Sequence, residues 1–161
     1  MKSLVAGVLA LVLAACIPTG SIHKNDLTTP CLVVSTFPGL AELGRYPLGS
    51  ANGFSLSFVH SVSVTPVTDR YEVVENKIVQ TSETFMAHGA GLPSSVDEPG
   101  GVSWTQENSE FCLHMDRPIE KLVVRTDRNY KNRLIIEDLT VNLNQWEDQA
   151  LLISVSTCQP R

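Results

Sequence analysis

The chain has 161 residues, of which 43% are hydrophobic and 18% are charged, with a formal net charge of −5. This length supports one domain, and this hydrophobic content with so small a net charge excludes a disordered chain. The acidic balance argues against a nucleic-acid-binding protein, because such proteins carry a basic surface for the phosphate backbone.

The N-terminus has the pattern of a bacterial secretion signal. An apolar segment at 4–13 is too short to span a bilayer as a helix, and the run Leu-Ala-Ala-Cys that ends at Cys16 resembles a lipobox. This predicts that residues 1–15 are a signal peptide and that Cys16 is acylated, which anchors the chain in a membrane. Ile17 follows in place of an aspartate, which favours the outer membrane in a Gram-negative host. A plain secretory signal that contains a cysteine is the alternative.

Residues 16–30 contain proline, threonine and serine without periodicity, and we expect a tether that leads to a domain at 31–161. Export places that domain in an oxidising compartment, where disulfides persist. Three cysteines remain in it, so at most one bridge forms within the chain. Cys31 opens the first predicted strand and Cys158 ends the last, and terminal strands often pair. We therefore predict a Cys31–Cys158 bridge and a buried free thiol at Cys112, with three free thiols as the alternative.

Beyond the tether the sequence predicts strands and no long helix. Apolar and polar residues alternate most clearly at 54–60. A hairpin is expected at 71–86, with its turn near Asn76. The predicted strands are 31–35, 54–60, 71–75, 77–86, 102–105, 110–114, 121–126, 133–136, 139–143 and 150–157.

Two long loops are expected at 37–53 and 87–101, because glycine and proline are frequent there. The one helix candidate, 40–45, lies within the first of these loops. Many short strands separated by turns predict an all-β fold. We expect a single-domain antiparallel β-sandwich or partly open barrel of about 8–10 short strands.

One stretch of the chain carries a recognisable pattern. It reads Phe-Val-His-Ser-Val at 58–62, then Pro-Val with Asp69 and Tyr71, and then Gly-Ala-Gly-Leu-Pro at 89–93. This pattern resembles an uncharacterised family of small exported bacterial proteins that are often encoded beside TAXI-type TRAP solute transporters. The resemblance covers residues 54–125 and departs from the family where Asp69 replaces a glutamate. It implies a strand-rich fold and a TRAP-type transport system as neighbour, but no reaction.

The same stretch supplies the candidate ligand-binding residues. His60 lies on the apolar face of its predicted strand, and a buried histidine or carboxylate needs partners. We therefore expect His60 within reach of Glu83 or Asp69, beneath the loop 87–93. The glycines after His88 can expose N–H groups that bind a carboxylate or phosphate. The candidates are His60, Ser61, Asp69, Glu83, His88, Gly89 and Gly91.

Other interpretations of these residues stay open. They can form a buried polar network that only specifies strand register. A small hydrolase or metal-dependent enzyme using His60, Glu83 and His88 is a further alternative. We predict no metal site, because neither His-x-x-x-His nor Cys-x-x-Cys spacing occurs. A serine nucleophile is disfavoured, because Ser61 and His60 are strand neighbours and point to opposite faces.

These patterns together predict a lipid-anchored protein of the cell envelope that faces the periplasm. We expect it to act as a binding or accessory module for a TRAP-type solute uptake system. Its partners would be the membrane and a transporter component or its solute, with no cofactor and no nucleic acid. A structural or assembly role for an envelope lipoprotein is the remaining alternative.

Overall fold

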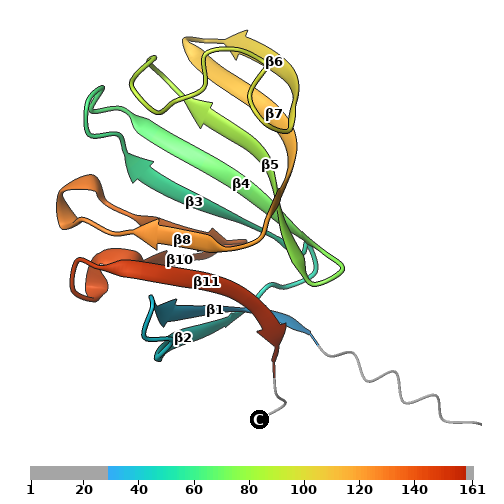
Figure 1. Ribbon diagram of the computed structural model, residues 1–161, viewed down its shortest axis with the longest axis vertical. Coiled ribbons are helices and arrows are strands. Elements are labelled where there is room, and N and C mark those ends of the chain that lie inside the picture. The colour runs from blue at the N-terminus through green and yellow to red at the C-terminus, as the bar shows by residue number, and fades with distance from the viewer. Residues whose placement is uncertain (1–28, 159–161) are drawn as a thin grey trace, which may run out of the picture.

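The computed structural model describes residues 29–158 and consists of two antiparallel β-sheets (Figure 1). The smaller sheet has the strand order β2-β1-β11-β8, and the larger sheet has the order β10-β9-β3-β4-β5-β7-β6. The sheets pack as an unclosed sandwich, so the predicted all-β antiparallel fold is confirmed. The predicted signal peptide, Cys16 and nearly all of the tether lie outside the described residues.

The strands are short and follow one another closely along the chain. The smaller sheet consists of β1 (Pro30–Thr36), β2 (Glu42–Pro47), β8 (Leu122–Arg125) and β11 (Ala150–Thr157). The larger sheet consists of β3 (Gly53–Val59), β4 (Pro66–Val74), β5 (Lys77–Phe85), β6 (Gly101–Glu107), β7 (Glu110–Ile119), β9 (Arg133–Ile136) and β10 (Leu139–Asn142). Two single 3₁₀ turns, Arg128–Tyr130 and Leu143–Gln145, connect strands near the C-terminus. Within the described residues none of the helices is long and apolar enough to cross a membrane.

The hairpin predicted at 71–86 is confirmed. Glu75 and Asn76 form its turn, and both have positive φ, at 50° and 63°. A two-residue turn with two positive φ angles has a twist that matches the right-handed twist of the flanking strands. This turn fixes β4 and β5 as neighbours and so sets which of their side chains face each other.

The prediction of a loop or short helix in 37–53 is wrong, because this segment contains β2. None of the β2 residues is fully buried and the strand has little apolar alternation, so its own pattern does not specify a strand. It forms because it pairs with β1, whose central residues are buried. Gly44 lies under the ring of Tyr46, where a Cβ atom would clash with that ring. The glycine that suggested a loop therefore serves close packing within a strand.

The core lies between the two sheets. Phe54 of β3 stacks on Tyr71 of β4, with their ring centroids 5.0 Å apart. The buried apolar residues of the main core are Leu32, Val34, Leu48, Phe54, Leu56, Tyr71, Ile78, Leu122, Leu134, Ile136, Val141, Leu143, Leu151 and Ile153. They come from both sheets, so the alternation in each strand buries one face against the other sheet.

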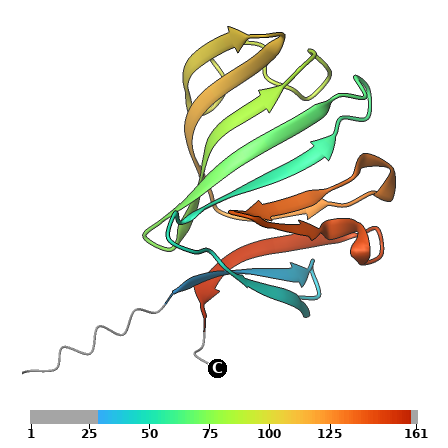
Figure 2. The ribbon, with the colours of Figure 1, turned by 180° about the vertical axis from the view of Figure 1, so that it is seen from behind.

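The predicted Cys31–Cys158 disulfide is confirmed. The two cysteines lie at the paired ends of β1 and β11, with Cα atoms 5.2 Å apart and a sequence separation of 127. Cys112 is free and half-buried. The bridge therefore closes the domain at the end where both described termini lie, away from the β3–β4 and β5–β6 connections (Figures 1 and 2).

Candidate functional site

Two carboxylates face each other on the inner side of the larger sheet. The β4–β5 ladder places Asp69 directly opposite Glu83. Side chains of such a cross-strand pair leave the same face of the sheet, with Cβ atoms about 4.5–5.5 Å apart. Asp69 also pairs with Leu56 of β3, a core residue. The structure therefore brings together two of the predicted site residues in the interior of the sandwich.

Burial raises the pKa of both carboxyl groups. The pKa of Asp69 rises to about 6, although hydrogen bonds from Tyr71 and Gln80 and the charge of Arg117 oppose the rise. Gln80 Nε2 donates to Asp69 Oδ1 at 3.0 Å. The pKa of Glu83 rises to about 7, first through burial and then through the negative charge of Asp69. The pair therefore changes its charge close to neutral pH, which is frequent at functional sites.

Arg117 of β7 is the cation that faces this pair. Its Nη1 lies 3.4 Å from Gln80 Oε1, so Gln80 links Arg117 to Asp69. Its Nε donates to the backbone carbonyl of Pro99 at 2.7 Å. Arg117 thus ties the β5–β6 loop to the inner face of the sheet. Sequence reasoning missed this residue, because the predicted strand ended at 114.

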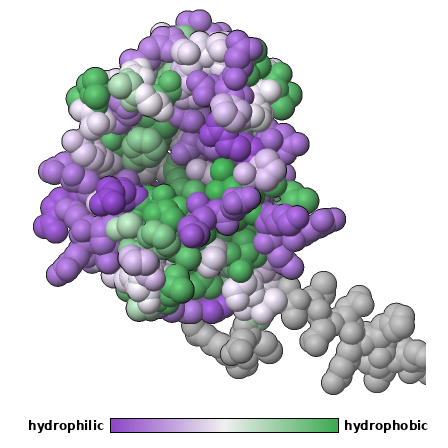
Figure 3. Space-filling view, viewed as in Figure 1, coloured by the Kyte–Doolittle hydropathy of each residue, from purple (hydrophilic) through white to green (hydrophobic). Residues whose placement is uncertain are grey.

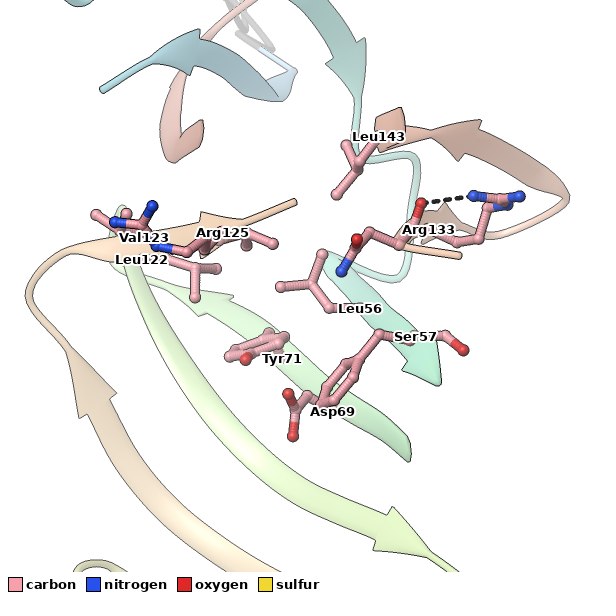
Figure 4. Close-up of a pocket in the computed structure, with 12 residues that line it drawn as sticks. Leu56, Ser57, Asp69, Tyr71, Leu122, Val123, Arg125, Arg133 and Leu143 are labelled. Atoms are coloured by element: carbon pink, nitrogen blue, oxygen red, sulfur yellow. Dashed lines mark hydrogen bonds between the residues drawn. The ribbon is translucent and has the colours of Figure 1, made fainter. Parts of the chain in front are cut away.

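A cleft of about 240 Å³ opens between the two sheets, and Asp69 lies in its wall (Figure 4). Asp69 and Tyr71 lie side by side on β4 and form one wall, and β8 forms the opposite wall. The apolar side chains around the opening are Leu56, Leu122 and Leu143. The lining also includes Ser57, Arg125, Asn132 and Arg133, so the cleft combines apolar side chains with one half-buried carboxyl group, one phenol and two arginines, a mixture of apolar and polar groups found in small-ligand sites.

His60 lies beneath the loop 87–93, as predicted. It is 8% exposed, and its Nε2 is 3.2 Å from the backbone oxygen of Ala90. Its Nδ1 accepts a hydrogen bond from the Ser63 backbone N–H at 3.2 Å. A backbone N–H group can only donate, so Nδ1 is the acceptor and the Nε2–H group donates a hydrogen bond to the Ala90 backbone oxygen. His60 therefore fastens the glycine-containing loop to the end of β3.

The expected contact of His60 with a carboxylate is wrong. Both ring nitrogens have partners in the turn and the loop, and within residues 29–158 no hydrogen bond joins His60 to Glu83 or Asp69. The ring also packs against Gly89, where a Cβ atom would lie 2.8 Å from His60 Cε1. The backbone therefore satisfies the imidazole.

The other predicted residues lie in the loops at this end of the domain. His88 is exposed and packs on Phe111, at 4.3 Å between ring centroids, and lies parallel to Trp104. Ser61 is exposed in the turn after β3. Gly91 has a φ of 89°, which explains the glycine there. The candidates thus separate into residues in or beneath the loops and the Asp69–Glu83 pair. The described part of the chain contains no cluster of side chains suited to a metal ion.

The fold and the cleft define an all-β sandwich domain with a half-buried carboxylate pair beside an opening between its sheets. A family model, the domain of unknown function DUF1850, matches residues 54–143, which is more than half of the chain. The chain therefore belongs to this family, and the predicted membership of an uncharacterised family is confirmed. Comparison with curated proteins and with solved structures found no match. The matched segment contains Asp69, Glu83 and Arg117.

Proposed function

We propose that this protein is a lipid-anchored binding module of the bacterial envelope that serves a TRAP-type solute uptake system. The observation that carries the binding role is the cleft between the sheets, with Asp69 and Tyr71 in its wall. A concave apolar site with few polar groups and a carboxyl group of raised pKa is the physical description of a ligand site.

The cleft favours a small ligand with two kinds of surface. About 240 Å³ accommodates a small solute or one part of a larger ligand. The leucines of the lining complement an apolar part of that ligand. Asp69, with its pKa near 6, is mostly ionised at pH 7 and complements a hydroxyl, amide or ammonium donor.

The proposed location rests on the N-terminal pattern and on the disulfide. The signal-like residues 1–15 and the Leu-Ala-Ala-Cys run support export and acylation at Cys16. The Cys31–Cys158 bridge suits an oxidising compartment such as the periplasm. We propose a membrane anchor at Cys16, on the outer membrane in a Gram-negative host, with a TRAP transporter component or its solute as the partner.

A hydrolase using His60, Glu83 and His88 receives less support. Among residues 29–158 no hydrogen bond joins these three side chains, and His88 packs on aromatic rings. An acid–base catalyst needs its groups to converge on one open position. Asp69 is better explained as a polar group in the wall of a binding cleft.

The test measures the thermal midpoint of the full-length protein in detergent against a panel of amino acids, dicarboxylic acids and sugars. We expect one class of solute to raise the midpoint of the wild type and of Ser61→Ala, a control remote from the cleft. The same solute should not raise the midpoint of Asp69→Asn. A panel without any effect, or an equal effect on Asp69→Asn, would contradict the proposed binding site.

A further inference from the structure

The outer face of the larger sheet carries a hollow that the proposed binding site does not use. Hydrophobic residues gather over β8 and β11 of the smaller sheet, on the face of the domain that Figure 3 shows. The hollow on the larger sheet measures about 370 Å³, which lies within the range of small-ligand sites. Every side chain that lines it is polar or a thiol, and these side chains come from β4, β5, β6 and β7. A ligand of this hollow is therefore polar over most of its surface.

Strand alternation directs one row of these side chains away from the core. Arg70 pairs with Ser82, and Ser82 pairs with His114, across β4, β5 and β7. Glu83 and Leu113, which come next to this row, face the other sheet. Successive side chains of a strand point to opposite faces, so the row of Arg70, Ser82 and His114 points outward.

Ser82 lies at the bottom of the hollow. It is only 6% exposed, whereas Arg70 and His114 on either side of it are exposed. In the described part of the chain its hydroxyl group has no hydrogen-bond partner, although the hydroxyl groups of Thr81 and Thr84 on the same strand both have one. A buried hydroxyl group is costly unless it is hydrogen-bonded. The Ser82 hydroxyl is therefore free to bond a ligand atom in the hollow.

Arg70 and His114 make this row a site for an anionic group. Adjacent strands are about 4.8 Å apart, so these two residues lie about 10 Å apart with Ser82 between them. Among residues 29–158 the ion pairs are formed by Arg45 and Arg128, and Arg70 has none. A guanidinium group binds a carboxylate or a phosphate through two parallel N–H groups, and an imidazole N–H and a serine hydroxyl can add further donors.

Hydroxyl groups and carboxylates continue the hollow toward the β6–β7 turn. The next outward row crosses four strands and consists of Thr68, Thr84, Cys112 and Thr105. The Thr84 hydroxyl donates to Cys112 Sγ at 3.5 Å, which leaves its lone pairs as acceptors. Glu107 and Glu110 pair beyond this row. Rows on one face are about 7 Å apart, so the two glutamates lie about 13 Å from the anion site.

We propose that this hollow is a second binding site and that its ligand is an acidic sugar, a sugar that carries a carboxylate or a phosphate. The acidic group binds between Arg70 and His114, above Ser82. The sugar hydroxyl groups are both donors and acceptors, so they pair with the threonine row and with the two glutamates alike. A neutral sugar leaves Arg70 without an anion, and a small anion leaves the threonine row unused. The hollow and Asp69 lie on opposite faces of the sheet, so this inference is independent of the proposed function.

The test is isothermal titration calorimetry of the full-length protein at low salt, in a detergent without a sugar headgroup. The probes are glucuronate and glucose 6-phosphate, which distinguish a carboxylate from a phosphate, and glucose and acetate, which each carry half of the proposed features. Arg70→Gln removes the cation, and Ser82→Ala removes only the buried hydroxyl group. Arg45→Gln is the matched control, because it removes the same charge from an exposed position on β2. Circular dichroism checks that each variant folds.

We expect at least one of the two acidic sugars to bind the wild type and Arg45→Gln with similar affinity. Glucose and acetate should bind the wild type at least about tenfold more weakly than this sugar. The affinity of the sugar should fall about tenfold or more in Arg70→Gln and about threefold or more in Ser82→Ala.

Three results would overturn the inference. They are no binding of either acidic sugar, binding of glucose or acetate as tight as that of the acidic sugar, and an unchanged affinity in Arg70→Gln or Ser82→Ala. The thermal panel with Asp69→Asn reports on the opposite face of the sheet. A solute that binds through Asp69 would therefore preserve the proposed function even where the acidic sugars fail.

Discussion

The half-buried pair of Asp69 and Glu83 makes a specific prediction about pH and stability. The pKa of Asp69 is about 6 in the folded protein against an ordinary value of 3.8, with burial as the main cause. Because the pKa is higher in the folded state, the native protein binds more protons than the unfolded chain at pH values between the two pKa values. The free energy of unfolding therefore falls as pH rises through this window. The difference corresponds to about 3 kcal/mol once Asp69 is fully ionised.

Asp69→Asn removes this titration and keeps an oxygen that can accept the hydrogen bond from Gln80. We expect the stability of the variant relative to the wild type to increase by up to about 3 kcal/mol between pH 4 and pH 8. Glu83, whose pKa also rises, to about 7, titrates in the same direction in both proteins. Because the charge of Asp69 contributes to the raised pKa of Glu83, the difference between the two proteins reports Asp69 together with its coupling to Glu83, and both contributions have the same sign.

The measurement is urea unfolding at a series of pH values with the disulfide intact. Glu72→Gln is the matched control, because Glu72 is exposed on the same strand and lies on the opposite face. Its difference from the wild type should vary little across the series. A stability difference for Asp69→Asn that is independent of pH, or that decreases as pH rises, would refute the reasoning.

Three further predictions concern the bridge, the loop and the anchor. Replacing Cys31 and Cys158 by serine should cost about 2–5 kcal/mol in urea unfolding, because a bridge across 127 residues restricts the unfolded chain strongly; an unchanged midpoint would contradict this. His60→Gln should cost about 1–3 kcal/mol through lost hydrogen bonds to Ala90 and the β3–β4 turn, and a melting temperature equal to that of the wild type would show that the loop does not need the imidazole. Cys16→Ala should abolish labelling by a fatty-acid analogue and release the protein from membranes, whereas persistent labelling would exclude acylation at this residue.

The sequence by itself determined the class of fold and several of its strands. The alternation at 54–60 specifies β3, because a period of two places Phe54 and Leu56 on one face whatever packs against them. With Cys16 assigned to the predicted lipid anchor, three cysteines remain, and the terminal positions of Cys31 and Cys158 were enough to predict the bridge. These features are local or lie at the ends of the chain, so no register between distant strands was needed to find them.

Only the tertiary structure decided which polar groups meet. Asp69 lies opposite Glu83 because the hairpin turn and a bulge after Arg70 set the register of β4 on β5. Arg117 joins them because β7 continues past the predicted end of its strand to pair with Gln80. A shift of one residue would turn these side chains to the other face of the sheet. The sequence pattern alone therefore could not specify the acidic pair and its arginine.

His60 and β2 illustrate the same limit. The sequence correctly indicated a buried histidine under a glycine-containing loop, but its partner is the backbone carbonyl of Ala90, which any residue there would supply. β2 is a strand because β1 offers it an edge, although its own residues are largely exposed. Every residue except proline carries the same backbone N–H and C=O groups, so the sequence does not show which of these groups will pair. Contacts made by the backbone are therefore visible only in the folded structure.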